Sequence, residues 1–153
     1  MNKKYKLTNI TMEYEGRTLY WIKALKNFSN VKAGDLGGWV QSEDNLSQEG
    51  CCWIYDEAKC MDDARMFDNS QMHDYSQMRG NSIMFDNSRI FDYSQMHDYS
   101  QMHEDSIMFD NSSIFDDSSI HDYSIMYGNT RMYDNSALYG YDELYGDTIL
   151  QGD

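Results

Sequence analysis

The chain has 153 residues, 26 of them acidic and 12 basic, so that its formal net charge is −14 at pH 7. This length suits one domain, or one domain with a small cap, and no stretch approaches the ~18 consecutive apolar residues of a membrane span. The negative charge argues against direct binding to nucleic acid or to anionic membranes and favours basic protein partners. The first residues lack a secretory signal and the three cysteines are an odd number, so we expect a cytoplasmic protein.

Residues 1–50 differ in charge from the rest, with 7 basic and 6 acidic residues against 5 basic and 20 acidic ones from residue 51 onward. Residues 5–13 and 18–25 are predicted to form two strands joined by a tight turn at Glu15-Gly16-Arg17. The following segment, VKAGDLGGWV, is a Gly-rich loop without phosphate-binding features, and its glycines are expected to let Trp39 fold over the first coil of the next domain. We interpret residues 1–50 as a β cap on a repeat domain at 51–153.

The remainder of the chain is a six-residue repeat. The 96 residues from Ile54 to Ile149 divide without insertion into 16 hexads, for example MFDNSQ, MHDYSQ and MFDNSR. The first position is Met, Ile, Leu or Cys in all 16 hexads, the fifth is Ser, Thr or Ala in 15, and the third is Asp in 11, Gly in 4 and Glu in one. A helix with 3.6 residues per turn cannot keep such a register on one face.

Each hexad is interpreted as a short strand followed by a corner. Positions five, six, one and two alternate inward and outward with the two-residue period of a strand, which puts the small and the apolar residue inside. Positions three and four form the corner, where Asp, Asn and Gly tolerate a left-handed backbone. Three such sides close a coil of three hexads, and coils stack ~4.8 Å apart. The sequence therefore predicts an all-β fold, a triangular β-helix (β-solenoid) of about five coils with a small N-terminal β-hairpin cap.

The aliphatic first position and the small fifth position resemble the left-handed β-helix of the hexapeptide-repeat superfamily, over about two-thirds of the chain. This resemblance implies left-handed winding, and a right-handed β-solenoid is the alternative. The whole layout, with KYKL, IKAL, VKAGDLGGWV and NLSQEGCCWIYDEAK ahead of the hexads, resembles a set of β-solenoid proteins of phages, prophages and bacteria. The second resemblance implies a solenoid with its own N-terminal cap and brings no catalytic residue with it.

Acidic residues at the third position are predicted to form rows along the three edges of the prism. The functional hypothesis is a non-enzymatic binding or inhibitor protein whose acidic rod imitates a nucleic acid and occupies the basic groove of a nucleic-acid-binding protein. With the phage resemblance, that partner would be a host defence nuclease or CRISPR component. The alternative is that Asp serves the corner geometry and its charge only keeps the rod soluble. The candidate binding residues are Asp56, Asp74, Asp92 and Asp110 on one edge, Asp98, Asp116 and Asp134 on another, Asp68, Asp86, Glu104 and Asp122 on the third, and an outward strip of Tyr55, His73, Phe91, Phe109, Tyr127 and Tyr145.

Four histidines, His73, His97, His103 and His121, occupy the outward second position. His103 and His121 are three hexads apart, so we expect them on successive coils roughly 5 Å apart. By resemblance, the alternative function is a hexapeptide-repeat acyltransferase or a metal-dependent enzyme that uses this pair at a subunit interface. The uninterrupted repeat lacks the loops that such enzymes usually need, and two histidines fall short of the three protein ligands of a catalytic zinc. The sequence therefore predicts no catalytic residue, no metal and no cofactor.

Cysteines and methionines are predicted to be core residues. Cys52 and Cys60 occupy inward positions, and Cys51 precedes them without a metal-binding spacing. The methionines are mostly at the inward first position, and Met61 alone is expected on the outside.

The last coil and an internal duplication bear on assembly and on the kind of site. Leu144, Tyr145 and Leu150 are predicted to leave an open edge that a second copy covers, which gives an end-to-end homodimer.

Residues 71–94 and 95–118 match at 19 of 24 positions, which is a block of four hexads. Because a coil takes three hexads, the copy falls one side further round the prism, and this favours a distributed surface over a point-like site.

Overall fold

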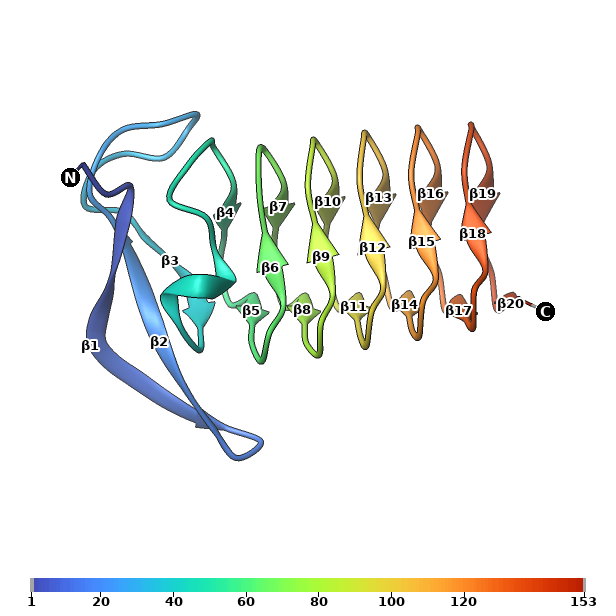
Figure 1. The fold of residues 1–153 in the computed structure, drawn as a ribbon, viewed down its shortest axis with the longest axis horizontal. Coiled ribbons are helices and arrows are strands. Elements are labelled where there is room, and N and C mark those ends of the chain that lie inside the picture. The colour runs from blue at the N-terminus through green and yellow to red at the C-terminus, as the bar shows by residue number, and fades with distance from the viewer. Residues whose placement is uncertain (1, 153) are drawn as a thin grey trace.

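The computed structural model describes residues 2–152 as a three-sided β-solenoid that begins with an antiparallel hairpin (Figure 1). The N-terminal part contains β1 (Tyr5–Tyr14), β2 (Arg17–Ala24), β3 (Leu36–Val40) and a 3-10 turn at Glu43–Asn45. The short strands that follow are β4 (Trp53–Ile54), β5 (Lys59–Cys60), β6 (Arg65–Met66), β7 (Gln71–Met72), β8 (Gln77–Met78), β9 (Ile83–Met84), β10 (Arg89–Ile90), β11 (Gln95–Met96), β12 (Gln101–Met102), β13 (Ile107–Met108), β14 (Ser113–Ile114), β15 (Ser119–Ile120), β16 (Ile125–Met126), β17 (Arg131–Tyr133), β18 (Ala137–Leu138), β19 (Glu143–Leu144) and β20 (Ile149–Gln151).

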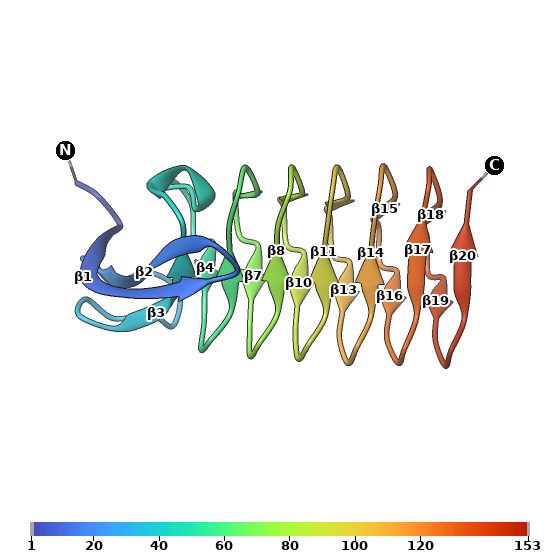
Figure 2. The same ribbon diagram turned by 90° about the horizontal axis from the view of Figure 1, so that it is seen from below.

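Among the described residues, three sheets form the sides of the solenoid, and in each of them the short strands pair in parallel with the strand three hexads further along the chain, as β7 does with β10. One sheet runs from β4 to β19 and another from β6 to β18, while the third joins β5 to β20 and also carries β3, β2 and β1. The stacked coils run from the N-terminal to the C-terminal end (Figures 1 and 2), which confirms the predicted fold class, a triangular left-handed β-helix.

The solenoid has about six turns, one more than the repeat count predicted, because the chain ahead of the hexads adds a turn. β3 pairs in parallel with β5, with Val40 opposite Cys60, and Leu46 forms a parallel bridge with Met66. Each of these pairs spans a longer stretch of chain than the three hexads of a regular coil, so the hexad register alone does not reveal them.

The corners have the backbone that the third position predicted. Every acidic residue at this position has a positive φ, between 55° and 62°, and the four glycines there also have positive φ. Residues other than Gly, Asn and Asp rarely adopt this region, because the Cβ atom of an L-residue approaches the following carbonyl oxygen there. Asp and Gly are therefore selected at the corner by backbone geometry.

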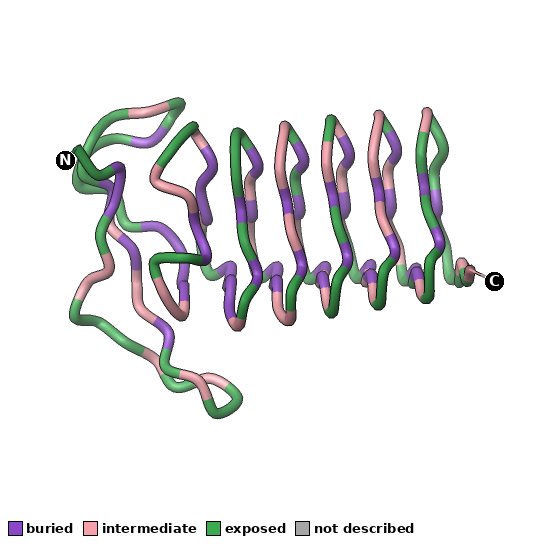
Figure 3. The backbone as a smooth tube through the Cα atoms, viewed as in Figure 1, coloured by how far each residue is buried: buried purple, intermediate pink, exposed green. Residues whose placement is uncertain are grey.

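Side chains at the first and fifth positions fill the bore of the solenoid. Figure 3 shows that buried positions recur from coil to coil. The first-position side chains are fully buried from Ile54 to Met132, and the fifth-position serines from Ser70 to Ser124 are as well. A buried hydroxyl costs free energy unless it is hydrogen-bonded. The serines meet this condition by donating to the carbonyl oxygen three residues earlier, as Ser70 does to Phe67 at 2.8 Å.

The cap lies on the sheet that contains β5, and it covers one residue that we expected to be exposed. Met61 does point away from the bore, yet it is fully buried because Leu19 of β2 and Trp39 of β3 pack on it. The prediction that Met61 is on the outer surface was therefore wrong. Gly38 explains the close approach of β3, because a Cβ atom there would lie 2.5 Å from the carbonyl oxygen of Ala58.

No helix within residues 2–152 has the length and apolar character needed to cross a membrane.

Candidate functional site

The acidic residues form three corner rows, each at the junction of two sheets. The first row follows the sheet of β4, the second follows the sheet of β5, and the third follows the sheet of β6. The predicted groups therefore assemble as expected from the spacing of three hexads. The first row contains Asp56, Asp74, Asp92 and Asp110, the second Asp98, Asp116 and Asp134, and the third Asp68, Asp86, Glu104 and Asp122.

Corner carboxylates also hold successive coils together. The Oδ2 atom of Asp74 accepts the backbone N–H of Asp92, and Asp92 accepts that of Asp110. Within residues 2–152, ten such bonds link a corner aspartate to the corner residue of the next coil, at 2.8–3.0 Å. We term this series the corner ladder. One oxygen of each ladder aspartate is thus used structurally, which supports the geometric explanation for Asp and still leaves its charge at the surface.

Stacked rings run beside all three corner rows, although the sequence predicted only one strip. In that strip Tyr55, His73 and Phe91 stack with centroids 4.4 and 4.6 Å apart, and Phe109 stacks on Tyr127 at 4.9 Å. Tyr145 continues it at 5.8 Å from Tyr127. The other two columns are His97, Phe115 and Tyr133 beside the second row, and Phe85, His103, His121 and Tyr139 beside the third.

Two of the four histidines are held by their own strands. The Nε2 atoms of His73 and His97 each lie 2.8 Å from the Oε1 atom of the glutamine two residues earlier, Gln71 and Gln95. Burial lowers the pKa of both imidazoles. These rings are therefore parts of the stacked columns.

The other two histidines lie beside carboxylates of the third corner row. The rings of His103 and His121 stack with centroids 4.9 Å apart, as the sequence predicted. The Nδ1 atom of His103 is 3.5 Å from Oε1 of Glu104, and the Nδ1 atom of His121 is 3.9 Å from the same oxygen. His121 Nδ1 is also 3.5 Å from Oδ2 of Asp122. The additional ligands that two histidines lack by themselves are present here as carboxylates of the same chain.

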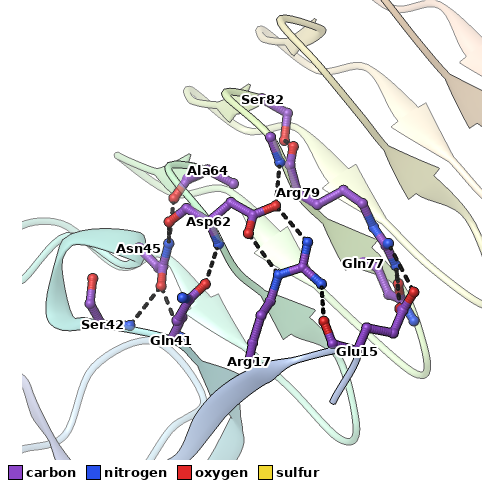
Figure 4. Close-up of polar contacts among 11 residues, drawn as sticks. Glu15, Arg17, Gln41, Ser42, Asn45, Asp62, Ala64, Gln77, Arg79 and Ser82 are labelled. Atoms are coloured by element: carbon purple, nitrogen blue, oxygen red, sulfur yellow. Dashed lines mark hydrogen bonds and ion pairs between the residues drawn. The ribbon is translucent and has the colours of Figure 1, made fainter.

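The second corner row begins beneath the cap, where its charge is neutralised (Figure 4). Arg17 of β2 donates to both carboxylate oxygens of Asp62, at 2.6 and 2.9 Å, and Asp62 also accepts the N–H of Gly80 at 3.0 Å. The Arg17 guanidinium holds the pKa of Asp62 below its usual range. Arg79 reaches Glu15 in the hairpin turn at 3.1 Å. The unpaired acidic surface of this row therefore begins at Asp98, further along the rod.

A buried lysine closes the N-terminal end of the bore. The Nζ atom of Lys4 donates to the carbonyl oxygen of Cys52 at 2.8 Å, and it lies 5.1 Å from the ring centroid of Phe28. Burial lowers the pKa of this amine and raises the pKa of the Cys52 and Cys60 thiols. Since a thiol must ionise to attack or to bind metal, Cys52 and Cys60 are core residues, as predicted.

At the other end of the rod, Leu144 is buried, Tyr145 is exposed and Leu150 is half-buried. β20 is the last strand of its sheet among the described residues. The homodimer through this coil stays a prediction.

The chain matches no known protein-family model. Over 36 residues it is 53% identical to a protein of Escherichia coli (strain K12) described as the uncharacterized acetyltransferase YdcK. The match covers 24% of this chain and 11% of the relative, so the chain spans only a small part of the length of that protein. Together with the stacked coils, the similarity agrees with a hexapeptide-repeat β-solenoid.

Proposed function

We propose that this chain is a non-enzymatic binding protein whose corner rows and aromatic columns occupy a basic, nucleic-acid-binding surface of another protein. The observation that carries the proposal is the linear density of fixed negative charge. From Ile90 to the C-terminus there are 13 acidic residues and a single basic one, Arg131. At three hexads and ~4.8 Å per coil, this is one net charge per ~1.4 Å of rod, close to the ~1.7 Å of double-stranded DNA.

Rigidity is the second support. The corner ladder fixes each aspartate relative to the next coil, so that a partner does not have to order the carboxylates when it binds. A groove of lysine and arginine that normally holds phosphates would meet a row of carboxylates able to accept charge-assisted hydrogen bonds. The rings of the aromatic columns stack on one another, so they add a rigid apolar surface of ring edges beside the rows of carboxylates.

The proposal places both proteins in the cytoplasm, that of the bacterial host if the chain is encoded by a phage. A nuclease or another nucleic-acid-handling protein of host defence is the kind of partner that such a mimic inhibits.

Capture from a bacterial lysate followed by competition tests this function. The immobilised chain should retain basic nucleic-acid-binding proteins, identified by mass spectrometry, and double-stranded DNA or raised salt should release them. A bait of lower charge, in which the second-row residues Asp98, Asp116 and Asp134 are changed to Asn, should retain less of the same proteins. Partners that neither DNA nor salt releases would show that mimicry is wrong.

The second candidate function is an acyltransferase that uses His103 and His121. The similarity to a protein described as an acetyltransferase favours it, as does the stacking of the two imidazoles. Against it, the strands from β4 to β20 follow one another without an inserted loop. Binding of acetyl-coenzyme A by the chain, measured by calorimetry and abolished in the double variant His103→Ala and His121→Ala, would replace the first proposal by this one.

A further inference from the structure

Glu104 interrupts the corner ladder. It is the single glutamate at the third position, and its own N–H still donates to Asp86 at 3.0 Å. Among the hydrogen bonds of residues 2–152, however, its carboxylate does not accept the N–H of Asp122 in the next coil, as an aspartate at this place would. The extra methylene turns this carboxylate toward His103 and His121 instead.

The carboxylate of Asp122 approaches the same point. Its Oδ2 atom accepts the N–H of Gly140 at 2.8 Å and lies 3.5 Å from Nδ1 of His121. One ligand atom from each of Glu104, His121 and Asp122 lies within 4.8 Å of the others. The hydrogen bond from the Gly140 N–H holds the Asp122 carboxylate in place beside Glu104 and His121. Two carboxylates this close, beside two imidazoles, are an arrangement that a cation stabilises.

The two copies of the internal duplication differ at residues of this same cluster. The blocks 71–94 and 95–118 differ at five positions, and three of these are consecutive, where Arg79-Gly80-Asn81 is replaced by His103-Glu104-Asp105. In the first copy the imidazole and the carboxylate are both missing, and Arg79 binds Glu15 of the cap. The two copies therefore share the scaffold and differ where the cluster stands.

The remaining histidines show what an imidazole does on this scaffold without a cluster. His73 and His97 each bind the glutamine two residues earlier, at 2.8 Å. His103 also follows a glutamine, Gln101, yet its Nδ1 atom lies 3.5 Å from the carboxylate of Glu104. The stacking of rings therefore does not by itself bring carboxylates to the imidazole nitrogen.

We propose that Glu104, His121 and Asp122 form a binding site for a divalent transition-metal ion of the zinc type. Mixed imidazole and carboxylate ligands suit such ions, with bonds of about 2.0–2.2 Å. Two ligand atoms on one tetrahedral ion are then ~3.4 Å apart. The 3.5 and 3.9 Å from His121 Nδ1 to the two carboxylates require only small movements.

His103 is the positioning residue of this site. Its Nδ1 atom lies 3.5 Å from Oε1 of Glu104, an electrostatic contact that keeps the carboxylate beside the two rings, and its own ring stacks on that of His121. Three protein ligands leave a fourth position to solvent, because the side chains of Glu104 and Asp122 remain partly exposed.

Titration with Zn²⁺ by calorimetry, and with Co²⁺ by visible absorption, tests the site on the full chain. One equivalent should bind, and Co²⁺ should give the intense visible bands of a four-coordinate ion. His121→Ala should weaken binding by at least ~100-fold and His103→Ala by ~10-fold, as expected of a ligand and of a residue that orients one. His97→Ala, which removes an imidazole at the same hexad position beside the second row, should leave binding unchanged.

Glu104→Asp is the decisive variant, because it keeps the charge and shortens the side chain. The shorter carboxylate should join the corner ladder by accepting the N–H of Asp122, so that metal binding falls at least ~10-fold while the thermal midpoint is kept or raised. Binding that is equally reduced by His97→Ala, or that survives both Glu104→Asp and His121→Ala, would overturn the proposal. The titration does not depend on the partner, so its failure leaves the proposed binding function to its own test.

Discussion

Asp92 gives the sharpest test of how the corners work. It has a left-handed backbone with φ of 59°, it accepts the N–H of Asp110 at 2.9 Å, and it donates its own N–H to Asp74 at 3.0 Å. Substitution by Asn, Gly or Ala separates these contributions. Asn keeps an acceptor and tolerates the left-handed region, Gly keeps only the backbone freedom, and Ala keeps neither.

The three substitutions should differ in the free energy of unfolding. Loss of the acceptor removes a hydrogen bond with a net value of ~1 kcal/mol. A residue without local hydrogen bonding costs a further ~1–2 kcal/mol in the left-handed region. Asp92→Ala should therefore destabilise by ~2–3 kcal/mol and Asp92→Gly by less than ~1 kcal/mol, because Gly relieves the backbone as it loses the bond. Asp92→Asn should stay within ~0.5 kcal/mol of the parent chain.

Urea denaturation followed by circular dichroism measures these differences, with Asp117→Ala, a change of an exposed fourth-position acid, as the control for loss of charge alone. The expected order of stability is parent and Asn, then Gly, then Ala. An Asn variant as unstable as the Ala variant would mean that the charge, and not the corner geometry, stabilises the coil. An Ala variant as stable as the parent would refute the corner ladder.

Four further changes test other parts of the fold. Met102→Ala should cost ~2–5 kcal/mol in the denaturation assay because the side chain is fully buried in the bore, and a cost below ~1 kcal/mol would contradict this packing. Gly38→Ala should cost ~1–3 kcal/mol, since the added Cβ atom has no room, and an unchanged stability would show that β3 does not approach the coil so closely. Burial lowers the pKa of His73 and His97, so the unfolded chain takes up these protons first and stability should fall as the pH drops below ~6.5. The double variant of both histidines to Phe should flatten this loss, and an unaltered pH dependence would mean that other groups cause it. Light scattering at micromolar concentration should report a dimer that Leu144→Asp abolishes, and a monomeric parent chain would exclude the end-to-end contact.

Much of the fold follows from the hexads because each position has one physical task. The apolar first position and the small fifth position predict the bore, and the third position predicts the left-handed corner, as the φ of 59° at Asp92 confirms. The burial of Met61 could not be predicted, because it depends on residues of the cap that lie far away in the sequence. The turn that contains β3 was missed for a related reason, since its pairing with β5 does not follow the hexad spacing.

The candidate site was predicted in outline and missed in detail. The spacing of three hexads placed the corner rows and the pair of His103 and His121. The same spacing could have revealed the second and third aromatic columns. Glu104 also carried a signal, since it is the single glutamate at its position and lies between His103 and the coil of Asp122. The sequence could not provide the direction of the Glu104 carboxylate. That direction depends on the longer side chain of Glu104, which does not accept the N–H of Asp122 as an aspartate would.

One measurement tests the central claim most directly. It compares the dissociation constant of a captured partner for the parent chain with that for a variant whose first corner row is neutral. The variant with Asp56, Asp74, Asp92 and Asp110 all changed to Asn should keep the circular dichroism spectrum of the parent, because Asn satisfies the corner. If each lost ion pair is worth ~0.5 kcal/mol, the dissociation constant should rise about thirty-fold and should depend less on salt. An affinity and a salt dependence equal to those of the parent chain, repeated with the second and third rows, would contradict a function based on acidic rows.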